Sequence, residues 1–133
     1  RVLDPGHVAT WDLPGAPAIV SKARKLVSAR LGDWGLQEDS FVTELLVSEL
    51  VTNAIRHASP PIRLRLIYEH HLTCEVSDGS STAPHLRRAR AHDEGGRGLL
   101  LVARLSRGWG TRHTRDGKTI WAETAVSRTP AET

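Results

Sequence analysis

The stretch from Glu38 to His57 constrains the fold more than any other part of this chain. Its apolar residues have the spacing of an amphipathic helix, with a stripe formed by Val42, Leu45, Leu46, Leu50 and Ala54. At about 100° per residue, Asn53 and His57 fall almost directly over Leu46, and Glu49 lies at the edge of the stripe. A carboxylate or an amide buried there without partners costs on the order of a few kcal/mol. We therefore predict a helix that covers a core and also lines a polar ligand site.

The composition is that of a single globular domain over residues 1–133, with a net charge of only +3. Basic residues cluster between Arg87 and Arg97, but acidic residues are spread along the chain, so direct nucleic-acid binding is not indicated. The single cysteine, Cys74, alternates in phase with Leu72 and Val76, which predicts a buried strand residue. Without a disulfide framework, a cytoplasmic location is expected. No membrane span or signal peptide is visible, and the absence of Met is expected of a domain excised from a longer protein.

Periodicity and turn residues divide the chain into alternating elements. We expect Gly32 to cap the first helix. The expected elements are a strand at 7–13, helices at 18–31 and 38–57, strands at 62–68 and 72–77, a long loop at 80–95, a helix at 98–105, strands at 109–113 and 119–124, and a flexible tail at 127–133.

This order predicts the fold class. The strands come as consecutive hairpins, one of them with the strong turn signal Asp116-Gly117, so the sheet should be mixed and mostly antiparallel. Three helices must then cover one of its faces. We predict an α+β fold, a two-layer α/β sandwich with helices on one face, and not a doubly wound parallel sheet.

Glu49 and Asn53 are the first candidates for chemistry, because residues four apart project from one face of a helix. An amide oxygen is a suitable ligand for Mg²⁺, which keeps several waters and is shared with phosphates. A nearby glutamate can deprotonate an attacking hydroxyl. The alternative is a helix face whose polar residues bond to a neighbouring loop.

Two further motifs favour a nucleotide. Asp78-Gly79 closes a strand, where a carboxylate can accept the amine of adenine and glycine lets a flat ring approach the backbone; a plain Asp-Gly turn is the alternative. The run 95–98, Gly-Gly-Arg-Gly, opens an apolar segment, where glycine N–H groups can face phosphates with help from Arg97; a hinge is the alternative. A dinucleotide-binding unit is excluded because no strand directly precedes these glycines.

In this order, the Glu-x-x-x-Asn helix, Asp-Gly and Gly-x-Gly resemble the GHKL ATP-binding superfamily (histidine-kinase-like ATPase domains). Within it, the bacterial anti-sigma-factor kinase group, in its actinobacterial-type branch, is the closest likeness. The stretch 48–58, Ser-Glu-Leu-Val-Thr-Asn-Ala-Ile-Arg-His-Ala, is similar to that group's N box. Residues 94–99 resemble its second glycine box, and 117–121 its closing strand.

The resemblance implies an ATP- and Mg²⁺-dependent serine kinase. Glu49 would be the general base, Asn53 the Mg²⁺ ligand, and Asp78 the residue that binds the adenine amine, assisted by Thr119 through water. Residues 80–97 would form a lid over the nucleotide. The full implied cofactor-binding set is Asn53, His57, Asp78, Gly79, Gly95, Gly96, Arg97, Gly98, Leu99 and Thr119. The implied partners are an anti-anti-sigma (STAS-type) protein, whose serine receives the phosphate, and a sigma factor that the kinase sequesters, often as a dimer. No membrane partner is implied.

The first glycine box departs from the superfamily pattern Asp-x-Gly-x-Gly, because residues 78–82 read Asp-Gly-Ser-Ser-Thr. Three other functions therefore stay open. The first is a non-catalytic ATP- or protein-binding regulatory domain of a multidomain phosphatase or signalling protein, the second the catalytic domain of a histidine kinase, and the third a basic nucleic-acid module. A serine kinase needs the carboxylate of Glu49, whereas a binding module needs only the fold.

Overall fold

The computed structural model describes residues 7–57, 61–79, 101–115 and 117–127, and it confirms the predicted α+β class. The elements are β1 (Val8–Leu13), α1 (Ile19–Asp33), the 3-10 turn η2 (Gln37–Asp39), α2 (Ser40–His57), β2 (Ile62–Tyr68), β3 (His71–Asp78), β4 (Gly108–Thr114) and β5 (Gly117–Ala125). Residues 101–105 are helical as well. The strands form one sheet in the order β1-β2-β3-β5-β4, in which every neighbouring pair is antiparallel.

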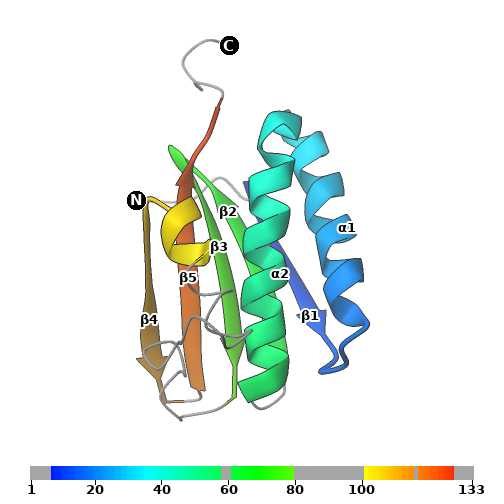
Figure 1. Cartoon of the computed structure of the whole chain (residues 1–133), viewed down its shortest axis with the longest axis vertical. Helices are drawn as coiled ribbons and strands as arrows, with labels where there is room; N and C mark the ends of the chain where they lie inside the picture. The colour runs from blue at the N-terminus through cyan, green and yellow to red at the C-terminus, as the bar shows by residue number, and fades with distance from the viewer. Residues whose placement is uncertain (1–6, 58–60, 80–100, 116, 128–133) are drawn as a thin grey trace.

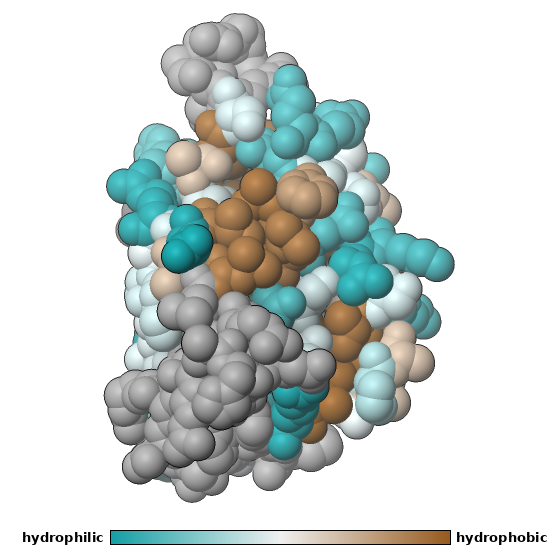
Figure 2. Space-filling model, in the orientation of Figure 1, coloured by the Kyte–Doolittle hydropathy of each residue, from teal (hydrophilic) through white to brown (hydrophobic). Residues whose placement is uncertain are grey.

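The helices lie on one face of this sheet (Figure 1). Strand residues that alternate toward this face are buried, among them Leu64, Leu66 and Val76, and they meet the buried stripes of α1 and α2. Cys74 belongs to the same set, as predicted, and burial raises the pKa of its thiol to about 12. A thiol that stays protonated at neutral pH is a core residue rather than a nucleophile. Figure 2 shows a patch of apolar surface in the middle of the helix-bearing face.

The end of α1 differs from the prediction, which placed the cap at Gly32. The helix continues to Asp33, and Gly35 carries the positive φ of 76° that ends it. The amide of Gly35 donates to the carbonyl of Gly32 at 3.1 Å, and that of Leu36 donates to Leu31 at 2.8 Å. These are the two hydrogen bonds of a Schellman motif, and the buried side chains of Leu31 and Leu36 supply its apolar contact.

The long second helix is confirmed from Ser40 to His57, after a separate 3-10 turn at Gln37–Asp39. Its buried stripe is wider than predicted, because Val47 and Val51 are fully buried beside Leu46 and Leu50. A wide stripe is required, since α2 packs against α1 as well as against β3. Within the described ranges, no helix combines the length and apolar character needed to cross a bilayer.

The two hairpins bring three chain segments to one end of the sheet. Because β2 starts just after α2 ends and β3 runs antiparallel to β2, the last residue of β3, Asp78, lies at the end of the molecule where α2 finishes. The register pairs Asp78 with Lys118 at the start of β5. In Figure 1, the lower ends of α2 and β3 and the start of β5 lie together. This end is the setting of the predicted nucleotide site.

Ser127 was assigned to the C-terminal tail, and its position is fixed. Its backbone amide and its hydroxyl both donate to Oδ1 of Asp39 at 3.0 Å. Residues 128–133 lie outside the described part of the chain.

Candidate functional site

Asn53 is a nearly buried amide near the C-terminal end of α2, with 7% of its surface exposed. Its side chain has no hydrogen bond in the described part of the chain. Its amide atoms are not among the fully buried, unpaired polar atoms of the described residues, which are Oδ2 of Asp39 and Oγ1 of Thr43. The amide of Asn53 therefore stays accessible to a ligand.

The donor chemistry around Asn53 fits Mg²⁺. Among the described residues, no three His, Cys, Asp or Glu side chains converge to form an all-protein metal site. Mg²⁺ does not need one, because it commonly takes one or two protein oxygens and completes its octahedron with waters and phosphates. The amide oxygen of Asn53 is an oxygen ligand of the required kind.

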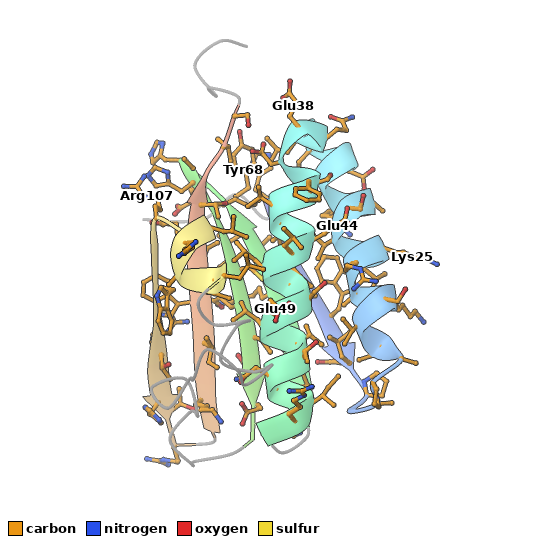
Figure 3. All side chains as sticks on the ribbon, in the orientation of Figure 1. Lys25, Glu38, Glu44, Glu49, Tyr68 and Arg107 are labelled. Carbon is orange, nitrogen blue, oxygen red and sulfur yellow. The ribbon has the colours of Figure 1, made fainter. Side chains whose placement is uncertain are left out.

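Glu49 lies one turn before Asn53 and is half-buried. Figure 3 shows it about halfway along α2, below Glu44. Its spacing of seven residues from Val42 puts it on nearly the same helix face, and Val42 lines a common cavity with Leu105. Glu49 therefore points toward the side of α2 on which residues 101–105 lie.

The surroundings of Glu49 favour its protonated form. Burial raises the pKa of this carboxyl above its usual value, and the positive charge of Arg56 opposes the increase without cancelling it. A carboxylate with a raised pKa is a better proton acceptor near neutral pH than an exposed one. Glu49 is suited in this respect to act as a general base.

Asp78 and Lys118 form a buried ion pair on the helix-bearing face of the sheet. The ammonium of Lys118 lies 3.2 Å from Oδ2 and 3.4 Å from Oδ1 of Asp78, and the two side chains are 3% and 2% exposed. Glycine is required at position 117 for β3 and β5 to lie this close, because a Cβ there would overlap the backbone carbonyl of Asp78. The carboxylate predicted to bind adenine thus already has a cationic neighbour.

Thr119 pairs with Ser77 across the two strands, and their hydroxyls are 2.8 Å apart. Strand alternation puts both side chains on the face away from the helices. Thr119 nevertheless lines the same cavity as Asp78, so its expected assistance to Asp78 through water stays a prediction.

A cavity of about 400 Å³ opens at this same end of the molecule. Its walls include three residues of the predicted nucleotide site, Asp78, Gly79 and Thr119, together with Lys118. Glu49 and Asn53 do not line it. The cavity therefore adjoins the strand-end part of the predicted site and not its helix part.

The remaining predicted residues cannot be placed by side chain. Gly95, Gly96, Arg97, Gly98, Leu99 and the expected lid at 80–97 lie outside the described residues. His57 is the last residue of α2, and Gly79 follows β3 directly and is exposed. Of the predicted set, the structure thus brings Asp78 and Gly79 to the end of the sheet where α2 finishes, with Asn53 in the last turns of that helix.

Lys118 was missed as a site residue, although the sequence carries a signal for it. It alternates in phase with Ile120 and Ala122, both of which are buried. A lysine on the core-facing phase of a strand is rarely buried without an anionic partner. The antiparallel pairing with β3 supplies Asp78 as that partner.

Asp78→Asn is expected to destabilise the fold by about 3–5 kcal/mol, because it leaves the ammonium of Lys118 buried without a counter-charge. Chemical denaturation would measure the change. The matched control is Asp12→Asn, which breaks an exposed ion pair with Arg63 (2.8 Å) and should cost about 0–1 kcal/mol. Equal effects of the two variants would contradict a buried pair, and the double variant Asp78→Asn/Lys118→Met should recover much of the loss.

Comparisons with known proteins identify the family and the fold. Residues 13–124 match the family model described as "Histidine kinase-like ATPase domain". The fold is similar to the RsbU and RsbW domains of Rv1364c from Mycobacterium tuberculosis, with a TM-score of 0.69 and 17% identity over 91% of this chain and 33% of that one. It is also similar to the histidine kinase domain of the blue-light activated histidine kinase EL346 from Erythrobacter litoralis, with a TM-score of 0.55 and 20% identity over 86% of this chain and 62% of that one. No curated protein matches the sequence significantly.

Proposed function

Because the chain belongs to the histidine kinase-like ATPase domain family, we propose that it binds ATP with Mg²⁺ and transfers the γ-phosphate to a serine of a partner protein. The observation that carries the proposal is the pair on α2. Glu49 is a half-buried carboxylate with a raised pKa, and Asn53, one turn away, is a nearly buried amide with no hydrogen bond among the described residues. A proton acceptor beside a free oxygen ligand is the arrangement that phosphoryl transfer to a hydroxyl requires.

Each residue has a defined task in this proposal. Asn53 holds Mg²⁺ through its amide oxygen, and the bound ion neutralises charge on the phosphates. Glu49 accepts the proton of the attacking serine hydroxyl, directly or through one water. The carboxylate of Asp78 accepts a hydrogen bond from the 6-amino group of adenine.

We propose an anti-anti-sigma protein as the phosphate acceptor and a sigma factor as a second partner. This part of the proposal rests on the likeness of residues 48–58 and 94–99 to anti-sigma-factor kinases. A homodimer and a cytoplasmic location belong to the same proposal. The location is supported by the proposed use of ATP.

The test is phosphate transfer from γ-labelled ATP to a candidate anti-anti-sigma protein, with and without Mg²⁺. The expected product is a phosphoserine, which survives acid treatment, on the partner and not on this chain. An acid-labile label on histidine would contradict the serine kinase and favour histidine kinase chemistry. Absence of transfer, together with normal ATP binding, would favour the second candidate function.

That second candidate is a non-catalytic, nucleotide-dependent binding domain of a larger protein. One observation favours it: residues 78–82 read Asp-Gly-Ser-Ser-Thr and lack the later glycines of the first glycine box. The chain spans 33% of the first structural neighbour and 62% of the second. The two candidates differ at Glu49, whose carboxylate matters for transfer but not for holding a partner.

A further inference from the structure

Lys118 has hydrogen-bonding capacity that its known contacts do not use. An ammonium carries three N–H donors, and the one acceptor recorded for this side chain in the described part of the chain is the carboxylate of Asp78. The two N–O distances, 3.2 and 3.4 Å, are longer than the 2.7–2.9 Å or so of a strong charge-assisted hydrogen bond. A side chain only 3% exposed thus keeps donors to spare.

Asp78 and Lys118 also line the same cavity of about 400 Å³, which gives a ligand access to the pair. Asp78 and Lys118 are cross-strand partners, so their side chains leave the same face of the sheet, in phase with the buried Val76 and Ile120. This is the helix-bearing face, at the end of the molecule where α2 finishes. Thr119 lies on the opposite face, bonded to Ser77.

A carboxylate beside an ammonium presents one acceptor and one donor side by side. The edge of adenine presents the complement, with the 6-amino group as donor and N1 as acceptor. Guanine presents the two in the reverse order, with O6 as acceptor and N1–H as donor. When the bound phosphates set the orientation of the nucleotide, the Asp78 carboxylate faces the 6-amino group of adenine and the Lys118 ammonium faces N1.

We propose that Lys118 is a specificity-determining residue, which donates a hydrogen bond to N1 of adenine while Asp78 accepts one from the 6-amino group. This inference rests on the proposed function, since it concerns the same nucleotide. It adds a direct protein contact to N1 from a residue that the sequence motifs did not single out.

The test uses 1-deaza-ATP, in which a C–H group replaces N1 and the amine is retained. Isothermal titration with Mg²⁺ should show that the wild-type protein binds 1-deaza-ATP about 10- to 100-fold more weakly than ATP, the range expected for losing one hydrogen bond to a charged group. Lys118→Met should bind the two nucleotides equally. Lys118→Arg, which keeps a charged donor, should retain the preference for ATP.

Lys25→Met is the matched control, because it makes the same change at an exposed lysine of α1 (Figure 3), and it should leave the preference unchanged. Equal binding of ATP and 1-deaza-ATP by the wild-type protein would overturn the inference, whether or not Lys118→Met folds. So would a preference that persists in Lys118→Met or disappears in Lys25→Met. Absence of ATP binding by the wild-type protein would instead overturn the proposed function itself, before any variant is compared.

Discussion

Asn53→Ala should abolish the Mg²⁺-dependent part of ATP binding and leave the melting temperature of the nucleotide-free protein nearly unchanged. The side chain makes no hydrogen bond among the described residues, so its removal leaves no protein partner unsatisfied there. The metal, by contrast, would lose a direct ligand, and even the loss of an outer-shell partner typically lowers metal affinity by about 10–100-fold. The measurement is titration of ATP at several Mg²⁺ concentrations.

Thr52→Ala is the matched control for this variant. Thr52 is the preceding residue on α2, is half-buried, and projects about 100° away from Asn53 around the helix. The Thr52→Ala variant should bind Mg²⁺ and ATP like the wild-type protein. If Asn53→Ala bound ATP with the same Mg²⁺ dependence as the wild type, the metal assignment would be wrong.

Glu49→Gln should lower the rate of phosphotransfer by about 10²–10⁴-fold, the range for loss of a general base, with nearly unchanged ATP affinity. The amide is close to isosteric with the carboxyl but cannot accept the serine proton. Glu44→Gln is the control, because Glu44 is a half-buried glutamate earlier on the same helix (Figure 3) with no place in the proposed chemistry. A Glu49→Gln variant that still transferred phosphate would remove Glu49 from the mechanism.

The Glu49→Gln substitution should also raise the melting temperature of the protein at neutral pH. Because the folded-state pKa of Glu49 lies above its usual value, the folded protein binds the proton more tightly than the unfolded chain does. Charged Glu49 therefore destabilises the fold at pH values above its raised pKa, and this cost disappears as the pH falls below the usual pKa of a glutamate. The gain in melting temperature of Glu49→Gln over wild type should shrink accordingly between neutral and acidic pH. A gain that grew on acidification would contradict the direction of the pKa shift.

Much of the fold could be predicted because its signals are local. The alternation in β2 and β3, the turn residues between β4 and β5, and the apolar stripe of α2 each depend on residues close in sequence. The predicted end of α1 was wrong because Gly32 and Gly35 are both plausible caps. Only the packing of Leu36 against the core decides between them. Propensity alone cannot make that choice.

The site residues on one helix could be predicted from the sequence. The contact between two strands of the site was harder to predict. Glu49 and Asn53 follow from helix periodicity, and the burial of Asn53 agrees with their predicted face. The contact between Asp78 and Lys118 depends on the register of β3 with β5, two strands separated by a long stretch of chain. A shift by one residue would have put Thr119, rather than Lys118, beside the carboxylate. The observed register therefore places Lys118 beside the carboxylate.

The most direct test of the central claim is calorimetric titration of the wild-type protein with ATP and with GTP, each with and without Mg²⁺. We expect ATP to bind with a dissociation constant in the micromolar range, to depend on Mg²⁺ through Asn53, and to bind more tightly than GTP through Asp78 and Lys118. Absence of ATP binding, or equal binding of both nucleotides without regard to Mg²⁺, would contradict the assignment of this end of the sheet as an ATP site.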